Sequence, residues 1–227
     1  MFFDKQTGWH LPDGEQHLQG WMLAKGDQCG ARLLYQGDKY RAALKHTGVK
    51  RRVAIDVGAH VGLWSWLMAK DFSDVMAFEP MPEHAECWRL NMMDSKACLI
   101  QTALGRENGR VNMITRTPGS SGDTNIAVAA DGPQRTPDAM ITTLDSYHLD
   151  YVDFIKADCE GFELFVMQGA EETLKRCRPC VIVEQKGKPG MSDRYGLGPT
   201  EAVEYLQSLG AVLRNTIMGD YILSWND

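Results

Sequence analysis

The residues with the clearest potential for chemistry lie in one segment, IDVGAHVG at positions 55–62. An apolar run passes there directly into glycines, and Gly58 and Gly62 allow the backbone to turn tightly and to approach a ligand closely. A helix that begins at Gly62 would offer free N–H groups and the positive end of its dipole. Asp56 stands just before the turn, so we expect its carboxylate to reach into the crevice above a sheet.

A second acid, Glu79, ends the next apolar run, 23 positions after Asp56. An acid at the tip of the second strand can accept both ribose hydroxyls of an adenosine-type ligand. Taken alone, each feature is better explained as structure, namely ordinary turn glycines and a solvated strand end. In this order and spacing, they predict a nucleoside cofactor at the carboxyl edge of the first two strands.

The glycine spacing distinguishes two kinds of nucleoside cofactor. A dinucleotide fingerprint is GxGxxG, which seats a pyrophosphate on the helix N-terminus. The pattern here is DxGxxxG, and Asp56 would repel a pyrophosphate but attract a sulfonium and an ammonium group. The loop therefore favours S-adenosylmethionine over NAD. An NAD-dependent oxidoreductase is the competing enzyme hypothesis, and a non-catalytic binding protein of the same fold is the non-enzyme hypothesis.

Three further carboxylates, Asp158, Glu160 and Glu184, stand at the ends of two later apolar runs. One of them is a candidate general base for an acceptor hydroxyl. Alternatively, the three could hold a divalent cation, since hard oxygen ligands suit magnesium or calcium. In the plainer interpretation, Asp158 contacts cofactor or substrate, Glu160 caps the following helix, and Glu184 pairs with Lys186 or Lys188.

Short apolar runs rich in β-branched residues alternate with helical patterns along the chain. The elements that they predict must position the glycines and acids described above. The runs are Val53–Val57, Val75–Glu79, Cys98–Gln101, Val152–Lys156, Cys180–Glu184 and Tyr221–Trp225. The helical candidates are Tyr40–Thr47, Leu63–Lys70, Glu83–Met93, Gly161–Arg176 and Thr200–Leu209. This alternation predicts an α/β fold, a doubly wound and mostly parallel sheet of about seven strands that is covered on both faces.

Two stretches interrupt the alternation. Residues 1–50 form a mixed segment that could be a lid, a dimer arm or a substrate-recognition element, and residues 51–227 form the predicted catalytic domain. Residues 117–138 are rich in Gly, Pro, Ser, Thr and Asp, and we expect this long loop near the substrate opening. It forms either a flexible loop or a polar lip over the acceptor, through Ser120, Ser121, Asp123 and Asn125.

Four segments resemble the FkbM-type class I methyltransferases. They are IDVGAHVG at 55–62, AFEPMPEH at 77–84, TALG at 102–105, and the stretch 142–184, in which KADCEG at 156–161 is the most specific part. The resemblance extends from about residue 52 to the end of the chain. It implies a Rossmann-like fold that uses S-adenosylmethionine, and methyl transfer to a hydroxyl oxygen of a small molecule or sugar.

The resemblance also implies roles for individual residues. Asp158 and Glu160 fall at the reaction centre, and the family often has Asn where this chain has His60. The residues that fall on cofactor-binding positions are Asp56, Gly58, Ala59, His60, Gly62, Glu79, Pro80, Thr102, Ala103 and Leu104. An asparagine-proline-proline-aromatic tetrapeptide, as used for amino-group methylation, is absent from the sequence, which favours O- over N-methylation.

Composition bounds the partners and the compartment. The 227 residues include 24 Lys and Arg against 30 Asp and Glu, a net charge of -6 that argues against a general nucleic-acid binder. The six cysteines are scattered through apolar stretches, and Cys177 and Cys180 are expected to flank a helix-to-strand turn. With Asp4 in an N-terminus that lacks an apolar core, we expect a cytoplasmic protein without a membrane partner. The sequence does not decide whether the protein is a monomer or a homodimer.

Overall fold

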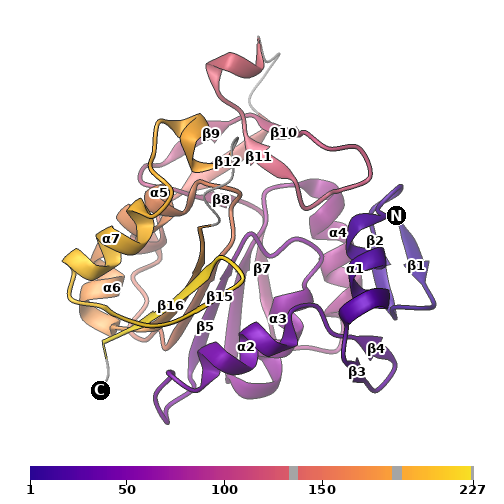
Figure 1. The fold of residues 1–227 in the computed structure, drawn as a ribbon, viewed down its shortest axis with the longest axis horizontal. Helices are drawn as coiled ribbons and strands as arrows, with labels where there is room; N and C mark the ends of the chain where they lie inside the picture. Colours follow the sequence, from indigo (N-terminus) through magenta and orange to yellow (C-terminus); the bar gives the residue numbers. More distant parts are fainter. Residues whose placement is uncertain (133–137, 186–190, 226–227) are drawn as a thin grey trace.

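A computed structural model describes residues 1–132, 138–185 and 191–225 and is organised around a central sheet. Seven strands form this sheet in the order β15-β16-β14-β13-β5-β6-β7 (Figure 1). Their bounds are β5 Val53–Val57, β6 Asp74–Phe78, β7 Cys98–Ile100, β13 Phe154–Ala157, β14 Cys180–Glu184, β15 Val212–Ile217 and β16 Asp220–Ser224. The predicted doubly wound, mostly parallel sheet is therefore confirmed.

The strand order places a switch point between β5 and β13. From β5 the chain builds outward through β6 and β7, and it then crosses to β13 and β14 on the other side. These five strands run parallel, whereas β16 is antiparallel to both β14 and β15. Ligands of doubly wound sheets bind where the strand order reverses, outside the carboxyl ends of the strands. Val57 and Ala157 end the two central strands at that point.

Helices cover both faces of the sheet, because alternate strand residues point to opposite faces. Ala54 belongs to the core beneath α2 (Gly37–Leu44) and α3 (Leu63–Asp71), and Ile55 to the core beneath α5, α6 and α7. Helix α4 (Pro82–Asn91) packs beside α3. Figure 1 shows α5, α6 and α7 (orange to yellow) on the opposite side of the sheet from α3 and α4 (purple).

The predicted helix Gly161–Arg176 is in fact two helices, α5 (Glu163–Gln168) and α6 (Glu171–Cys177). Gly169 separates them, and a Cβ at this residue would lie 1.9 Å from the Gly105 carbonyl oxygen. The break thus lets two backbone segments approach closely. Cys177 ends α6 and Cys180 begins β14, which confirms the predicted helix-to-strand turn. Helix α7 spans Glu201–Ser208.

Small sheets lie beside the central one. β8 (Ala103–Leu104), β12 (Ala139–Thr142) and β9 (Gly109–Val111) form one, and β10 (Met113–Thr115) pairs with β11 (Thr124–Ile126). Short 3-10 helices occur at η1 Ala129–Asp131, η2 Leu144–Tyr147 and η3 Ser192–Tyr195. The predicted loop 117–138 therefore contains β11 and η1, while its residues 133–137 lie outside the described residues.

The first fifty residues pack against the rest of the chain. They form β1 (Phe2–Asp4), β2 (Trp9–Leu11), α1 (His17–Lys25), β3 (Gln28–Cys29), β4 (Arg32–Leu33) and α2. Trp9, Leu11 and Met22 share a buried cluster with Val61, in the loop after β5, and with Leu63 at the start of α3. The division at residue 50 remains a prediction. Among the described residues, no helix is long and apolar enough to cross a membrane.

Candidate cofactor and acceptor site

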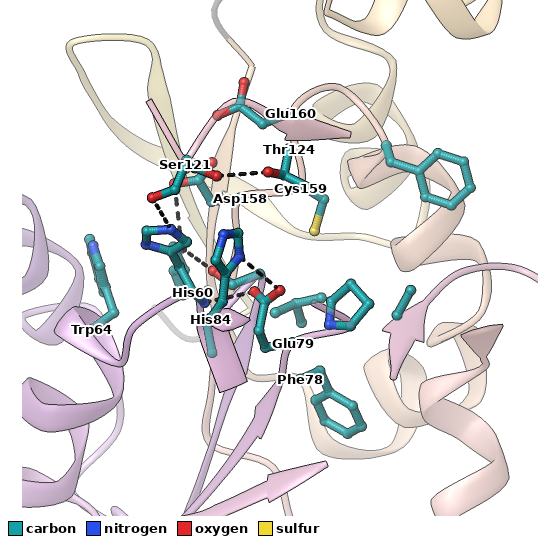
Figure 2. A pocket seen from close by; sticks show the side chains of 18 of the residues that line it. His60, Trp64, Phe78, Glu79, His84, Ser121, Thr124, Asp158, Cys159 and Glu160 are labelled. Atoms are coloured by element: carbon teal, nitrogen blue, oxygen red, sulfur yellow. Dashed lines mark hydrogen bonds and ion pairs between the residues drawn. The ribbon is translucent and has the colours of Figure 1, made fainter. Parts of the chain in front are cut away.

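A pocket of about 950 Å³, part of it open to solvent, lies at the carboxyl ends of β5, β6 and β13. Figure 2 shows His60, Glu79, His84, Ser121 and Asp158 converging around it. Of the residues expected from the sequence, those that line the pocket are Gly58, Ala59, His60, Glu79, Pro80, Ala103, Leu104, Asp158 and Glu160.

The loop after β5, residues 58–62, contains Gly58 and Gly62, and we call it the glycine loop. It crosses the switch point in close contact with the end of β13. Gly58 has a φ of +73°, and a Cβ on it would lie 2.0 Å from the Asp158 carbonyl oxygen. The N–H groups of Gly58 and Ala59 both donate to the Phe78 carbonyl, each at 3.0 Å. The loop is thereby fixed to both neighbouring strands, and only glycine fits at position 58 without moving the backbone.

Gly62 and Thr102 help to shape the site without lining the pocket. Gly62 is the N-cap of α3 with a φ of +93°, and a Cβ there would lie 2.9 Å from the Trp88 ring. Thr102 is buried, and its hydroxyl donates to the Met140 carbonyl at 2.9 Å. Both residues therefore hold neighbouring segments in place.

Asp56 requires a correction, because its carboxylate does not reach into the crevice. The side chain is fully buried beneath the pocket. Its Oδ2 accepts a hydrogen bond of 2.6 Å from the Ser65 hydroxyl on α3, and its Oδ1 lies 3.9 Å from Lys156 Nζ. Burial raises the pKa of Asp56, and Lys156 and Ser65 oppose that rise. Side chains alternate along a strand, and position 56 points toward α3.

Glu79 lines the pocket with its carboxylate already held by three donors. Oε2 accepts the His60 backbone N–H at 2.9 Å, and Oε1 accepts the Met81 N–H at 2.9 Å. His84 Nδ1 lies 3.2 Å from the same Oε1, and both side chains are almost fully buried. A carboxylate has about four acceptor sites, so one place on Glu79 is left for a ligand hydroxyl.

Lys156 is a buried cation at the pocket wall whose role was not predicted from its sequence motif. Its Nζ lies 3.4 Å from Asp158 Oδ2 and donates to the Gly58 carbonyl at 3.4 Å. Burial lowers the pKa of Lys156, but Asp158 and Asp56 outweigh that effect, so the pKa is raised overall. The lysine therefore stays charged and offsets part of the negative charge of Asp158.

The three predicted carboxylates do come together. Asp158, Glu160 and Glu184 each place one oxygen within 4.8 Å of the others. Asp158 and Glu160 line the pocket, whereas Glu184 is buried at the end of β14 and does not. The lysines expected to pair with Glu184, at positions 186 and 188, lie outside the described residues.

Glu160 is not the N-cap residue of the following helix, which differs from the plainer interpretation. The N-cap of α5 is Phe162, which makes no side-chain capping bond. Glu163 binds the turn instead, because its Oε1 accepts the N–H groups of Cys159 at 2.7 Å and Gly161 at 3.1 Å. Burial raises the pKa of Glu163 to about 7.

The loop between β10 and β11 lies over the pocket, as expected from the sequence. Ser121 and Thr124 line the pocket, but Ser120, Asp123 and Asn125 do not, so the predicted polar lip is smaller than expected. Asp123 instead binds within its own loop, accepting hydrogen bonds from Thr117 and Asn125.

The N-terminal segment contributes to the pocket through Leu18 and Tyr35, which the sequence did not reveal. It also holds the β10–β11 loop, since the N–H groups of Gln16 and His17 donate to the Gly119 carbonyl at 2.9 and 3.1 Å. Nothing in the pattern of residues 1–50 marks these contacts. They arise only when two segments about 100 positions apart meet in the fold.

The sheet order, the switch-point pocket and the glycine loop together define a Rossmann-like class I methyltransferase fold. The family model of the methyltransferase FkbM domain matches residues 56–213. The chain belongs to this family, which uses S-adenosylmethionine. Membership of this methyltransferase family favours the methyltransferase hypothesis over the NAD-dependent oxidoreductase considered from the sequence.

Two solved structures show the same fold. One is the methyltransferase FkbM from Methylobacillus flagellatus, with 17% identity, a TM-score of 0.50, and coverage of 77% of this chain and 43% of that one. This chain thus spans less than half the length of that protein. The other is a structure described as a methyltransferase from Streptococcus mutans in complex with S-adenosylhomocysteine. It has 10% identity and a TM-score of 0.50, and the match covers 84% of this chain and 96% of that one. A search of curated proteins found no match.

Proposed function

We propose that this protein transfers a methyl group from S-adenosylmethionine to a hydroxyl oxygen of a small molecule or sugar. One observation carries the proposal. The glycine loop, Glu79, and Asp158 all face a single pocket at the switch point. Family membership supports the donor, and the absence of an amino-methylation motif supports oxygen as the acceptor atom.

The residues of the pocket fit the proposed donor. Glu79 has an open acceptor site for a ribose hydroxyl. Pro80, Ala103 and Leu104 offer apolar surface for an adenine on one side of that acid. Gly58 itself lines the pocket, and its lack of a side chain lets the loop pack directly against the Asp158 carbonyl. When bound, S-adenosylmethionine supplies an electrophilic methyl group on a sulfonium.

The protein's contribution to such a reaction is alignment and exclusion of water. The β10–β11 loop, with Ser121 and Thr124, covers the pocket, and the N-terminal segment holds that loop. Leu18 and Tyr35 of the N-terminal segment supply apolar surface for the acceptor. An acceptor with an apolar face beside its reacting hydroxyl matches these surroundings.

Asp158, Glu160 and Glu184 are our candidates for activating the hydroxyl, with or without a divalent cation. Their proximity within 4.8 Å supports either role. The two roles are separated by exhaustive dialysis against EDTA, followed by an assay with and without added magnesium. Loss of turnover that magnesium restores would support the cation, and unchanged turnover would exclude it.

The donor is tested first, by thermal unfolding with S-adenosylmethionine, S-adenosylhomocysteine and, as a control, NAD. Saturation at about 100 times the dissociation constant adds about 2.7 kcal/mol, which raises Tm by about 5–10 °C for a chain of this size. Shifts with the first two ligands and none with NAD support the proposal. Mass spectrometry of the denatured protein detects any ligand that is retained through purification and would mask a shift.

The acceptor is then sought with a methyl-labelled donor and a panel of hydroxylated compounds, sugars and amines. Label recovered in an ether linkage supports O-methylation, whereas label on nitrogen overturns that part of the proposal. Cofactor binding without transfer to any member of the panel would favour the non-catalytic hypothesis. Size-exclusion chromatography with light scattering tests whether the protein forms a homodimer.

A further inference from the structure

A chain of three side chains joins the N-terminal segment to the rim of the pocket. Glu15 Oε2 accepts the backbone N–H of Ser121 at 2.6 Å and also accepts the Ser121 hydroxyl proton. The same Ser121 hydroxyl oxygen lies 2.8 Å from His60 Nε2 (Figure 2). The three residues come from three segments of the chain, and both Ser121 and His60 line the pocket.

The direction of these hydrogen bonds fixes the tautomer of His60. Glu15 is almost fully buried and receives a further N–H, from Leu18 to Oε1 at 2.7 Å, so all its contacts are donors, as an ionised carboxylate requires. Ser121 has one hydroxyl proton, and it goes to Glu15. His60 Nε2 must then donate to the Ser121 oxygen, which leaves Nδ1 with the lone pair of a neutral ring.

The surroundings of the ring favour this neutral form. The His84 ring packs against it with 4.3 Å between centroids, and Glu79 Oε2 accepts the His60 backbone N–H. Burial, His84 and Lys156 lower the pKa of His60 well below its usual value, and Asp158 opposes them. Nδ1 makes no hydrogen bond among the described residues, so a ligand hydroxyl is its available partner.

We propose that His60 Nδ1, in place of the three carboxylates considered above, is the general base for the acceptor hydroxyl, and that Glu15 is a positioning residue that acts on His60 through Ser121. In this step, the O–H bond of the acceptor breaks and an N–H bond forms at Nδ1. The oxygen keeps the electron pair with which it accepts the methyl group. The proton returns to water after the reaction. The proposal rests on the proposed O-methylation.

Asp158 is less suited to this task than His60. Its Oδ2 forms an ion pair with Lys156 at 3.4 Å, so this oxygen is already in contact with a cation. In His60, by contrast, Nε2 donates to the Ser121 hydroxyl oxygen, and the Ser121 hydroxyl donates in turn to the Glu15 carboxylate. That chain stabilises the imidazolium that forms, in the way that orienting groups assist catalytic histidines.

The tautomer is measured without any ligand, by NMR of protein with 15N-labelled histidine rings. The signals of His60 are identified by their loss in His60→Asn. We expect a protonated Nε2 and an unprotonated Nδ1 in the wild type. In Ser121→Ala and Glu15→Gln, we expect a shift toward a mixture of tautomers. Asp13→Asn is the matched control, because Asp13 is an exposed acid of the same segment, and it should leave the spectrum unchanged.

Kinetics complete the test. We expect His60→Asn to lower kcat by about 100-fold, the lower range for removal of a general base. Ser121→Ala and Glu15→Gln should lower kcat more than they raise the KM of the acceptor, and Ser121→Thr, which keeps the hydroxyl, should restore most of the rate. A protonated Nδ1 in the wild type, or full kcat in His60→Asn, would overturn the proposal. Failure of the proposed function itself is distinct, since wild-type protein would then bind no S-adenosylhomocysteine or would transfer no methyl group to an oxygen.

Discussion

Lys156 and Asp56 face each other across two paired central strands, with 3.9 Å between Nζ and Oδ1. Neither side chain is more than 8% exposed. The pair lies directly below the glycine loop, and the Lys156 ammonium also donates to the Gly58 carbonyl. The floor of the pocket is therefore a charged layer inside the sheet rather than an apolar one, and its stability depends on both partners.

Removing the cation alone should strongly destabilise the protein. Lys156→Met leaves Asp56 and Asp158 without their buried counter-ion, and breaking such a pair costs about 3–5 kcal/mol. Urea unfolding measures the loss. The double variant with Asp56→Asn should recover a large part of it, while Lys175→Met, which breaks an exposed ion pair with Glu171, should have little effect. A single variant as stable as the wild type would contradict the role of this layer.

Gly58→Ala should cost more than the left-handed backbone alone accounts for. A non-glycine residue at positive φ costs about 1–2 kcal/mol, and here the added Cβ would also lie 2.0 Å from the Asp158 carbonyl oxygen. Gly30→Ala is the matched control, because Gly30 has a φ of +61° and nothing within 4 Å of the added carbon. Thermal unfolding compares the two variants, and equal losses would argue against the close approach.

Glu79→Gln should weaken binding of S-adenosylhomocysteine by about 10–100-fold. The variant loses a charged acceptor, and hydrogen bonds to charged groups contribute about 1.5–3 kcal/mol each. Isothermal titration calorimetry gives the dissociation constants. Glu86→Gln, which changes an exposed acid on helix α4 shortly after Glu79 in the sequence, serves as control. Equal affinity of the wild type and Glu79→Gln would show that the ligand does not contact this acid.

Glu163 should make stability depend on pH between about 4.5 and 7. Burial raises its pKa in the folded protein from 4.5 to about 7, so the folded state binds the proton more tightly than the unfolded state. The associated stability is fully present below pH 4.5 and is lost as the pH rises through 7, by about 3 kcal/mol for a shift of this size.

The pH dependence is measured by denaturant unfolding at pH 4.5, 6 and 8. We expect the wild type to lose stability relative to Glu163→Gln across this series. Glu172→Gln removes an exposed acid of the neighbouring helix and should run parallel to the wild type. A constant difference between wild type and Glu163→Gln would mean that Glu163 titrates near its ordinary pKa.

The central strands could be predicted because burial on both faces leaves a local signature. Val53–Val57 and Cys180–Glu184 are continuous apolar runs that end in an acid or a turn, and both are strands with the expected bounds. The two-residue strands of the N-terminal segment, Gln28–Cys29 and Arg32–Leu33, carry too few residues to show any periodicity. Only their partners in the fold define them.

The candidate site was predictable where backbone geometry dictates residue type. In the sequence, Gly58 indicates a tight turn and Glu79 indicates the end of a strand, and both residues line the pocket. The direction of Asp56 depended on which face of β5 position 56 occupies, and an apolar run on a sheet covered on both faces does not reveal this. The contact between Glu15 and Ser121 was hidden for another reason, since it joins positions 106 residues apart.

The position of β5 has a consequence for how the chain folds. It is the first strand of the central sheet in sequence, yet it lies between β6 and β13, and its register with β13 joins Ala54 to Phe154. At a synthesis rate of about 5–20 residues per second, the growing chain waits several seconds between making β5 and making its second partner. During that interval the backbone N–H and C=O groups on the edge of β5 that later faces β13 have no strand to pair with. Productive folding on the ribosome thus requires that this edge be shielded until the second half of the sheet emerges.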